Sequence, residues 1–541
     1  MSLSCNKQIL SNLFYNGQLY PLLLCQYLLV TSDHCSGEEL PGGVKCIDEE
    51  RRVLLTFRHH LTDPSAGFLL GQAGDNCCQW NGLSCDNQTS HIVKMDLRNP
   101  YPYRIYNDEW DFKDYQQSCL SGKINPSLLS LKHLYYLDLS WNDFHGIHIP
   151  NFLGKLTSLR YLNLSYASFR EEIPHFLGNL SNLNYLDLDN SRPSNSPSNN
   201  PDENLSSKNL NWFSRLFSLK YLNLGRANLG GAGLPLSFNS SIPSWISNLT
   251  SLSTLDLHDN AFSGQIPKEF ASFKNLEHLD LSVNELEGQI PKLTGKFCTL
   301  KTFNLADNRF EEGLRDVLNG LTDCSNTRLE SLDFSLNWLE SELPASIGKL
   351  HKLQYLNLEG NSFFGSIPES IGNLKSMRKL ILSRNLMNGS IPEVLGQLVL
   401  LDLSGNLWEG SLTESHFGNL TKLDSFLVST DRPLPLIFNV TYDSLPPFKL
   451  HEIYIANCLV GDAFAVWLQS QTELSDVTLS GTVISGIPEE WLLKISSQVE
   501  FLDFSHNQIQ GQIRFESQSI FQVYSIKFWR TNAKSTNVVA V

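Results

Sequence analysis

The sequence has little positive charge and no recognisable catalytic motif. Its 541 residues include 41 Lys and Arg against 56 Asp and Glu, a formal net charge of -15. A protein that binds nucleic acid without regard to sequence needs a basic face, so this balance argues against that class. No segment resembles a nucleotide-binding loop, a kinase core, or a Ser/His/Asp or Cys/His arrangement. The sequence therefore gives no positive support for an enzyme, and we expect no catalytic residue, metal or cofactor.

Long apolar runs are also lacking. The run at residues 19–30 suits the core of a signal peptide and is too short for an ordinary membrane helix. We interpret residues 1–36 as a signal peptide and leader, which directs the chain to the secretory pathway. The alternative is a mis-assigned start, with an ordinary buried segment or no function there. Residues 514–541 contain no apolar run near 20 residues either.

What the chain does contain is a repeated phrase, Leu-x-x-Leu-x-Leu-x-x-Asn. It stands at Leu252–Asn260, Leu276–Asn284 and Leu300–Asn308, at steps of 24 residues. A fixed period of this size predicts a stacked solenoid. Counting the first Leu as offset 0, offsets 0, 3 and 5 point inward from a short strand, and the residues between point outward. The sixteen repeat starts are Ile92, Leu134, Leu159, Leu183, Leu219, Leu252, Leu276, Leu300, Leu329, Leu353, Met377, Leu398, Leu423, Leu450, Leu474 and Val499.

Polar and turn residues recur at fixed places in the repeat. The Asn at offset 8 carries two donors and an acceptor, so we expect it to bond turn backbone groups that would otherwise be buried unpaired. A Gly-x-Ile-Pro element follows, as in Gly264–Pro267. Together these motifs resemble the plant-type leucine-rich repeat. The resemblance implies an α/β repeat solenoid, a plant-type leucine-rich-repeat superhelix, over residues 91–513.

Residues 46–90 read as an N-terminal cap. An amphipathic helix is expected from Asp48 to Leu61, and Cys-Cys-x-Trp-x-Gly-x-x-Cys follows at 77–85. This block resembles the caps of plant leucine-rich-repeat receptors and of polygalacturonase-inhibiting proteins. The resemblance implies two disulfides, Cys46 with Cys77 and Cys78 with Cys85. A zinc site is the weaker alternative, because the cysteines lack paired Cys-x-x-Cys spacing.

The end of the chain departs from the pattern. Residues 514–541 hold no repeat phrase and no terminal cysteine cap, so we treat them as a non-repeat tail. A solenoid normally has a capping unit at each end. We therefore expect the strand at Val499 to end uncovered, and we interpret the chain as a truncated form of a longer receptor.

Three segments carry a closer resemblance. Cys77–Trp80, Asn211–Phe213 and Gly122–Leu131 are similar to plant receptor-like proteins of the ethylene-inducing-xylanase-receptor and Cf type. The resemblance implies an extracellular ectodomain that recognises a peptide, protein or glycan ligand in plant defence. It also implies an adaptor receptor kinase and a co-receptor kinase as partners, and the plasma membrane if a C-terminal span exists. The alternatives are a secreted inhibitor of a wall-degrading enzyme, or a non-signalling truncated decoy.

Eleven cysteines and nine Asn-x-Ser/Thr sequons support the secretory route. Neighbouring repeats would bring Cys298 and Cys324 to similar heights, so a third disulfide is expected there; two buried thiols are the alternative. Nucleic acid is not an expected partner. The sequon residues, each an expected glycosylation site, are Asn87, Asn163, Asn179, Asn204, Asn239, Asn248, Asn388, Asn419 and Asn439.

Aromatic and basic residues gather at outward positions near the N-terminal third. They suit a protein or peptide docking strip on the inner face of the solenoid. The alternative is that the tyrosines stack on cross-strand neighbours and stabilise the sheet. A second basic strip, Arg378, Lys379 and Arg384, would suit an acidic ligand, or is simply a solvated edge. The expected ligand-binding residues are Tyr136, Trp141, Arg160, Tyr161, Tyr166, Tyr185, Tyr221 and Arg226.

Offset 4 is mostly Asp or Asn, as at Asp138, Asp187, Asp256, Asp280 and Asp333. Closely spaced carboxylates suggest acid–base catalysis or calcium. We prefer a structural explanation, because Leu-Asp-Leu and Leu-Asn-Leu are ordinary forms of the repeat phrase.

Overall fold

A computed structural model describes most of the chain from residue 44 to residue 509, and short strands beyond it. The described ranges are 44–64, 76–99, 115, 117–190, 204–207, 210–229, 241–291, 297–324, 326–431, 436–443, 445–461, 463–495 and 497–509, with the backbone of 512–515, 525–527 and 537–540. The chain divides into two units, Met1–Glu285 and Leu286–Val541. The expected signal peptide and the sequon at Asn239 lie outside the described residues.

The cap of the first unit is built from a helix, a short hairpin and two disulfides. Helix α3 (Asp48–His59) buries Leu54 and Phe57, as the apolar spacing predicts. Cys46 is bonded to Cys77 and Cys78 to Cys85, which confirms both expected disulfides. The remaining elements are β1 (Leu61–Thr62), the 3₁₀ helix η1 (Cys77–Gln79), β2 (Leu83–Cys85) and β4 (Ser121–Gly122).

Strand β2 covers the first repeat strand, β3 (Ile92–Asp96), in antiparallel pairing. A buried carboxylate also ties the cap helix to this strand, because Glu50 accepts hydrogen bonds from the Ile92 amide at 2.8 Å and His91 Nδ1 at 2.9 Å. The cap thus closes the open edge of the first strand, which would otherwise expose unpaired backbone groups.

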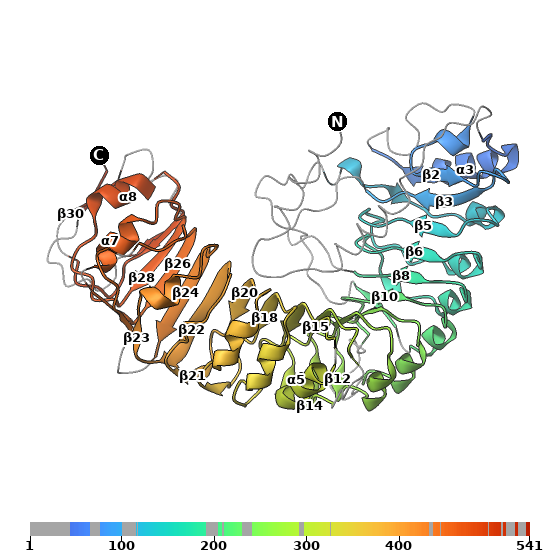
Figure 1. The fold of residues 1–541 in the computed structure, drawn as a ribbon. Helices are drawn as coiled ribbons and strands as arrows, with labels where there is room; N and C mark the ends of the chain where they lie inside the picture. The colour runs from blue at the N-terminus through green and yellow to red at the C-terminus, as the bar shows by residue number, and fades with distance from the viewer. Residues whose placement is uncertain are drawn as a thin grey trace. The chain divides into compact units, whose positions relative to one another are not determined.

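The first unit stacks its repeat strands in one parallel ladder (Figure 1). Strand β3 begins at the predicted start Ile92, and each later strand begins two residues after its predicted start. The register pairs equivalent offsets, as in Tyr161 with Tyr185 and Leu162 with Leu186. The ladder strands are β3, β5 (Tyr136–Asp138), β6 (Tyr161–Asn163), β8 (Tyr185–Asp187), β10 (Tyr221–Asn223), β11 (Thr254–Asp256) and β13 (His278–Asp280).

The second unit continues the same pattern by itself. Its strands lengthen toward the C-terminal end, where β22, β24, β26 and β28 have five to nine residues. The ladder strands are β15 (Thr302–Asn304), β17 (Ser331–Asp333), β18 (Tyr355–Asn357), β20 (Lys379–Ile381), β22 (Leu400–Trp408), β24 (Ser425–Thr430), β26 (Glu452–Ala456), β28 (Asp476–Ser480), β29 (Phe501–Asp503) and β31 (Ser525–Lys527).

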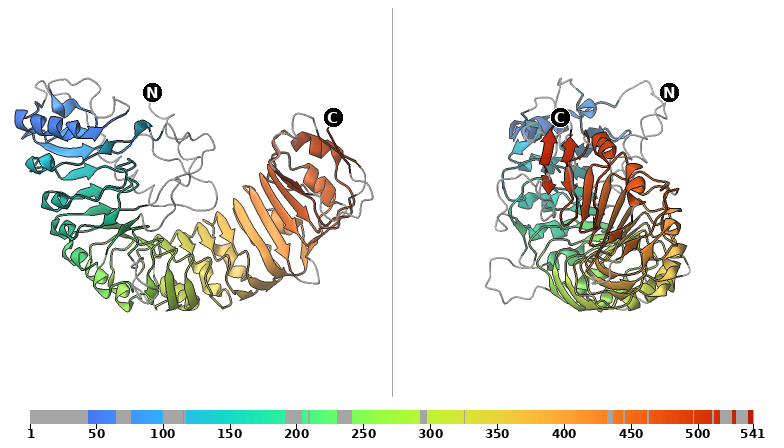
Figure 2. Two further views of the ribbon diagram at one scale, coloured as in Figure 1. Left: turned by 180° about the vertical axis from the view of Figure 1, so that it is seen from behind. Right: turned by 90° about the vertical axis from the view of Figure 1, so that its left-hand side faces the viewer.

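Short helices return the chain on the side of each repeat away from the ladder (Figure 2). Six of the 3₁₀ helices begin directly after a proline, which suits a residue with a fixed φ and no N–H. The helices are η2 (Pro126–Ser130), η3 (Asn151–Lys155), η4 (His175–Asn179), η6 (Asn211–Arg215), η7 (Ser244–Asn248), η8 (Lys268–Ser272), η9 (Ala345–Lys349), η10 (Glu369–Asn373), α5 (Leu314–Thr322), α6 (Glu414–Phe417), α7 (Phe464–Gln469) and α8 (Glu489–Ile495).

In several repeats a short strand of two to five residues follows the ladder strand in chain order. These short strands are β7 (Glu171–Glu172), β9 (Leu205–Ser206), β12 (Ser263–Gly264), β14 (Glu285–Gln289), β16 (Arg309–Glu312), β19 (Phe364–Gly365), β21 (Leu386–Gly389), β23 (Ser411–Leu412), β25 (Ile437–Phe438) and β27 (Leu459–Val460). Gly365 and Gly389 of the Gly-x-Ile-Pro element have φ near 80°, a conformation that an L side chain rarely adopts.

The leucines form the continuous core that the repeat predicts. Leu252, Leu255 and Leu257, at offsets 0, 3 and 5 of one repeat, are all fully buried. One repeat cannot bury these side chains by itself, so stability comes from the contact with its neighbours.

The offset-8 asparagines do what the sequence predicts. Asn361 Nδ2 donates to the carbonyls of Phe334 in the preceding repeat at 2.9 Å and of Leu358 and Glu359 in its own at 3.2 Å. Its Oδ1 accepts from the Leu339 amide at 3.0 Å. One side chain therefore satisfies four backbone groups of the turn. It can do so because an amide both donates and accepts hydrogen bonds.

A disulfide links Cys298 and Cys324, as expected from their places before two successive strands. Cys119 and Cys458 are free and buried. Cys458 occupies the offset-8 position, where its sulfur lies 3.3 Å from the Ala456 carbonyl oxygen.

The tail contradicts one expectation. Strand β31 pairs in parallel with β29, and Ile526 takes the register of Leu502. Beside this ladder, β30 (Gln512–Phe515) pairs with β32 (Asn537–Ala540). The strand after Val499 is therefore covered, and the expectation that it would end uncovered was wrong. Val523, Ile526 and Phe528 keep the spacing of offsets 0, 3 and 5, but Thr531 replaces the Asn that would have marked a repeat.

Candidate ligand-binding face

The outward residues of the ladder strands form a surface that we call the strand face. In the first unit its most regular feature is a row of four tyrosines at offset 2. Tyr136, Tyr161, Tyr185 and Tyr221 stack face to face, with successive ring centroids 4.0, 4.1 and 4.1 Å apart. Tyr185 and Tyr221 are buried, at 7% and 6% exposure. The rings therefore cover one another's faces, as the sheet-stabilising alternative predicts, and the binding role of these four residues stays a prediction.

The tyrosine hydroxyls are paired with carboxylates at offset 4. Tyr161 donates to Asp138 Oδ2 at 3.1 Å, and Tyr185 donates to Asp187 Oδ2 at 3.2 Å. Burial raises the pKa of both Asp138 and Asp187, and the nearby charges of Asp96 and Asp189, respectively, add to the effect. The phenol donors compensate part of the cost of burying these acids. The hydroxyls of Tyr161 and Tyr185 are therefore already used as donors within the protein.

A second aromatic pair is more accessible. Trp141 and Tyr166, both at offset 7, stack at 4.0 Å with an angle of 4° between their planes. Both are only partly buried, Tyr135 is 44% exposed, and Arg160 is exposed. We call Tyr135, Trp141, Arg160 and Tyr166 the aromatic strip. Trp141 and Tyr166 follow the strands at offset 7, whereas Tyr135 and Arg160 precede them at offset 1, where the Arg160 amide donates to the Tyr135 carbonyl at 2.8 Å. Large aromatic side chains together with an arginine are the composition of binding hot spots.

Trp141, Tyr166 and Arg226 share an unusual backbone conformation. Their φ angles are 59°, 53° and 52°. An L residue in this region is uncommon and carries a modest conformational cost. Residues in other repeats have it at the same offset, Asp307 and His506 among them, so it belongs to the turn of the repeat rather than to this surface alone.

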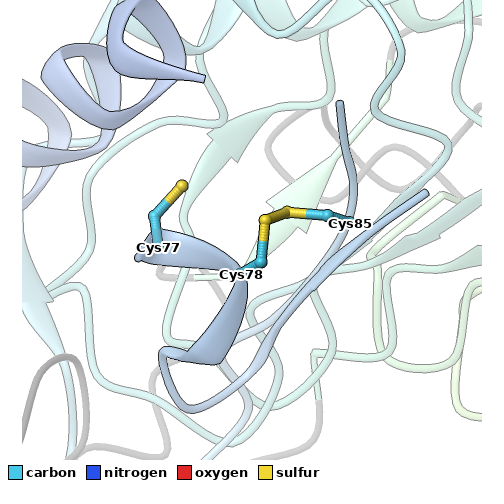
Figure 3. Close-up of side chains that lie close together, drawn as sticks. All are labelled: Cys77, Cys78 and Cys85. Carbon is cyan, nitrogen blue, oxygen red and sulfur yellow. A yellow bond between two sulfur atoms is a disulfide. The ribbon is translucent and has the colours of Figure 1, made fainter. Parts of the chain in front are cut away.

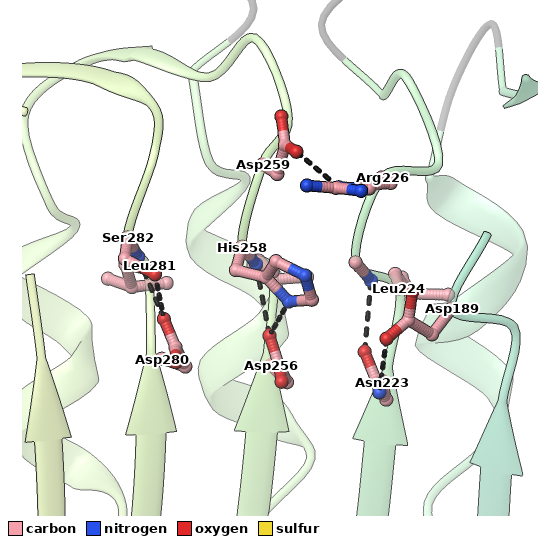
Figure 4. Close-up of polar contacts among 12 residues, drawn as sticks. Asp189, Asn223, Leu224, Arg226, Asp256, His258, Asp259, Asp280, Leu281 and Ser282 are labelled. Atoms are coloured by element: carbon pink, nitrogen blue, oxygen red, sulfur yellow. Dashed lines mark hydrogen bonds and ion pairs between the residues drawn. The ribbon is translucent and has the colours of Figure 1, made fainter. Parts of the chain in front are cut away.

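Arg226 does not stand as a free cation. Its Nε is ion-paired with Asp259 Oδ2, and both side chains are partly exposed (Figure 4). A ligand that binds Arg226 would therefore compete with Asp259.

The same figure shows a polar cluster that the sequence did not single out. His258 Nδ1 lies 2.8 Å from Asp256 Oδ1, and Asn223 Nδ2 lies 3.5 Å from Asp189 Oδ2. Burial alone would lower the pKa of His258, but the charges of Asp256, Asp189 and Asp280 outweigh it and raise that pKa to about 10. Burial, with the charge of Asp256, raises the pKa of Asp280 to about 6.

The acidic residues at offset 4 have structural partners. Asp333 Oδ1 accepts from the Ser335 amide at 3.0 Å and its hydroxyl at 2.6 Å, while Oδ2 accepts from Tyr355 and Asn357 at 3.0 and 3.1 Å. Asp138 and Asp280 hold the same contacts to Ser140 and Ser282. These bonds support the structural explanation over catalysis or calcium binding.

Among the described residues, one group of potential ligands has metal-like spacing, Cys77, Cys78 and Cys85. Figure 3 shows the Cys78–Cys85 disulfide beside Cys77, which is bonded to Cys46. Sulfurs in disulfides are not the thiolates that zinc requires. The zinc alternative is therefore wrong in this oxidised form.

The second basic strip is less available than its sequence suggests. Arg384 forms an ion pair with Glu359 at 3.5 Å, and Arg378 is exposed. Burial lowers the pKa of Lys379, and Asp424 opposes that shift. These contacts favour the solvated-edge alternative.

The sequons differ in exposure. Asn163 is 4% exposed, and its Oδ1 accepts from the Ser165 amide and hydroxyl at 3.0 and 2.7 Å. This burial argues against the expected glycan at Asn163. Modification at the other described sequons stays a prediction: Asn87, Asn179, Asn248, Asn419 and Asn439 are exposed, and Asn204 and Asn388 are half-buried.

Sequence reasoning also missed a hollow in the second unit. It has a volume of about 650 Å³ and lies over β26, β28 and β29 on the strand face. These repeats match the phrase poorly, with Ile, Val and Phe in place of several leucines, so the phrase gives little indication of their outward residues. The register alone would have brought Glu452 and Asp476 side by side.

Comparison with known proteins agrees with this architecture. A leucine-rich-repeat N-terminal domain matches residues 47–86, and leucine-rich repeats match 158–180, 251–273, 275–297 and 352–374. Receptor-like protein EIX1 of Solanum lycopersicum is 34% identical over 253 residues, covering 41% of this chain and 22% of its own. Receptor-like protein 39 of Arabidopsis thaliana is 30% identical over 470 residues, covering 80% and 47%. The chain is a leucine-rich-repeat protein homologous to plant receptor-like proteins.

Solved structures show the same fold. The ectodomain of the receptor kinase GASSHO1/SCHENGEN3 from Arabidopsis thaliana, in complex with CASPARIAN STRIP INTEGRITY FACTOR 2, has a TM-score of 0.57 at 23% identity and covers 90% of this chain and 61% of its own. The Arabidopsis HAESA ectodomain, in complex with an extended IDA peptide hormone ligand, has a TM-score of 0.54 at 23% identity, with 91% and 89% covered.

The leucine-rich-repeat protein spans less than half the length of the receptor-like proteins it matches. In its described residues, no helix is long and apolar enough to cross a membrane.

Proposed function

We propose that this leucine-rich-repeat protein recognises an extracellular ligand as part of a plant receptor-like protein, in defence signalling through partner receptor kinases. Its homology to receptor-like proteins carries the proposal. The solved ectodomains of similar fold hold peptide ligands, and the HAESA ectodomain also binds the co-receptor SERK1. Secretion into the extracellular space, with the repeats outside the cell, belongs to the same proposal.

The aromatic strip is the surface we propose for this recognition in the first unit. Its stacked Trp141 and Tyr166 present fixed rings, which lose little conformational entropy on binding, and Arg160 adds an exposed cation. The four stacked tyrosines, at offset 2 of the same strand face, would stabilise the sheet that carries the strip rather than contact the ligand themselves.

Sequestration of a microbial elicitor tests the proposal. The purified 541-residue chain, secreted by plant cells, is added in excess to cultured plant cells before a panel of bacterial and fungal culture filtrates. We expect the oxidative burst to fall for at least one filtrate, and to recover when the chain carries Trp141→Ala and Tyr166→Ala. A matched control is Phe217→Ala, an exposed aromatic residue outside the aromatic strip. Bursts that remain unchanged with every filtrate would overturn ligand recognition.

The same preparation separates the inhibitor alternative. A secreted inhibitor would reduce the rate at which a fungal polygalacturonase cleaves its polymer, in the absence of any plant cell. A receptor ectodomain would leave that rate unchanged while it quenches the burst.

A further inference from the structure

The hollow in the second unit is lined by residues that no part of the proposed function uses. Three adjacent strands and the turns that follow them form it. Its polar and aromatic lining residues include Glu452, Tyr454, Asn457, Asp476, Thr478, Phe501, Asp503 and His506. A volume of about 650 Å³ lies within the range of ordinary ligand sites.

Two carboxylates face this hollow from neighbouring strands. Glu452 of β26 and Asp476 of β28 share one register row, so about 4.8 Å of sheet separates their backbones. Like charges placed directly opposite each other in a sheet are destabilising. Burial raises the pKa of Glu452, and the charge of Asp476 adds to the rise. The fold therefore keeps an unfavourable pair at a position where no other predicted repeat carries an acid.

The pair is not neutralised by the described part of the chain. Neither Glu452 nor Asp476 forms an ion pair there, and no Lys or Arg lines the hollow. The exposed His451, which precedes Glu452, is hydrogen-bonded to a different acid, with its Nδ1 2.5 Å from Asp424 Oδ1. Asp503 differs from these two acids, because Lys527 of β31 takes the register position beside it.

Aromatic side chains stand next to the two acids. Phe501 continues the register row of Asp476, and Tyr454 lies two residues along β26 from Glu452. Both are only partly buried. Acidic groups beside accessible aromatic faces suit a guanidinium or ammonium group on a partly apolar partner, since such cations pair with carboxylates and pack against rings.

We propose that this hollow docks an extended peptide segment with a central arginine or lysine, whose cation Glu452 and Asp476 bind while Tyr454 and Phe501 contact its neighbouring side chains. Ser475 Oγ donates to Asp476 Oδ2 at 2.7 Å and Ser425 bonds Glu452, but neither donor carries a charge. Charge complementarity selects this partner, because the described lining offers two acids without an ion pair and aromatic rings but no Lys or Arg for an acidic one. The proposal goes beyond the aromatic strip, which lies in the other unit.

The test compares two pools of fluorescently labelled random nonapeptides, one with arginine fixed at the centre and one with glutamate. Binding to the full secreted chain is measured by fluorescence anisotropy. We expect the arginine pool to bind on the order of tenfold more tightly than the glutamate pool, because its cation gains charge-assisted hydrogen bonds to the two acids and the glutamate is repelled by them.

A matched pair of variants locates the binding. Glu452→Gln with Asp476→Asn should reduce the affinity for the arginine pool about tenfold without lowering the thermal midpoint. Asp307→Asn with Glu330→Gln removes the same net charge from exposed positions of the same unit, outside the hollow, and should leave the affinity unchanged. Equal binding of both pools, or equal losses in both double variants, would overturn the proposal. Elicitor sequestration through Trp141 and Tyr166 could still succeed, so the two proposals fail separately.

Discussion

The offset-2 position is used in opposite ways in the two units. In the first unit it holds four tyrosines that stack at about 4 Å and bond buried carboxylates through their hydroxyls. In the second unit, on β24 to β29, the same position holds Ser425, Glu452, Asp476 and Phe501 beside an open hollow. The backbone and register are the same in both places, so the difference lies in the side chains.

This difference separates structure from recognition within one repeat. A row whose members satisfy one another stabilises the sheet and offers little to a partner. A row that leaves like charges adjacent costs stability and gains from a partner of opposite charge. A regular pattern in the sequence is therefore a poor guide to the binding surface. The most regular row, the four tyrosines, is the one whose rings and hydroxyls already contact other residues of the protein.

The largest effect should come from breaking the tyrosine row at its centre. Tyr185→Ala removes a buried ring with a stacked neighbour on each side, and should lower the free energy of unfolding by about 3–4 kcal/mol. Tyr185→Phe keeps the ring and loses only the bond to Asp187, a cost of about 1 kcal/mol. Urea unfolding followed by fluorescence measures both. Similar losses for the two variants would show that the hydroxyl network, not the stack, holds the row.

The histidine cluster predicts a pH dependence in the first unit. Because the folded pKa of His258 is raised from 6.5 to about 10, its contribution to stability is complete below about pH 6.5 and is lost as pH rises through 10. The thermal midpoint of the native chain should therefore fall between pH 7 and 10. His258→Gln should flatten part of that fall, measured by circular dichroism in matched buffers. Parallel pH profiles of the two proteins would contradict the cluster's role.

Removing one negative charge should have opposite effects at two positions of the second unit. Asp333→Asn replaces an oxygen that accepts from Tyr355 and Asn357, so it should destabilise by about 1–2 kcal/mol. The urea midpoint of unfolding measures this loss, provided that the slope of the transition is the same in both proteins. An unchanged midpoint would mean that the offset-4 carboxylates are not needed for the turn.

The smallest effect is expected from Asp476→Asn. This change relieves the adjacency with Glu452 and should be neutral or stabilising, by up to about 1 kcal/mol, most clearly at low salt. Unfolding at 20 mM and 500 mM NaCl, which differ about fivefold in screening length, would show it. Asp476 Oδ2 accepts from the Ser475 hydroxyl at 2.7 Å. A loss of stability comparable to that of Asp333→Asn would mean that this bond outweighs the repulsion from Glu452, and the comparison between the rows would fail.

Much of the fold could be predicted from the sequence because the same leucine and asparagine spacing recurs in many repeats. Fifteen of the sixteen predicted starts precede a ladder strand by two residues, and the first, Ile92, is itself the first residue of β3. Asn361 and its equivalents close turns as expected. Strand β31 was missed because a single repeat without Leu and Asn carries too little signal. The disulfide cap followed from a family resemblance rather than from spacing alone.

The site could be predicted only in part. The alignment of Tyr136, Tyr161, Tyr185 and Tyr221 was correct, but composition cannot tell whether a ring's face is covered by its neighbour. The ion pair of Arg226 with Asp259 and the burial of Asn163 depend likewise on side-chain packing. The hollow depends on the register between repeats that scarcely match the phrase, and a search by phrase passes over them.

The most direct test of the central claim is to locate a bound basic peptide. A nonapeptide from the arginine pool, carrying a benzophenone beside its arginine, is cross-linked to the native chain by light and mapped by mass spectrometry. We predict cross-links at Tyr454, Asn457 and His506, which line the hollow, and their loss in the Glu452→Gln and Asp476→Asn double variant. Cross-links confined to the tyrosine row and the aromatic strip would contradict the claim that the acidic row, rather than the stacked one, is open to this partner.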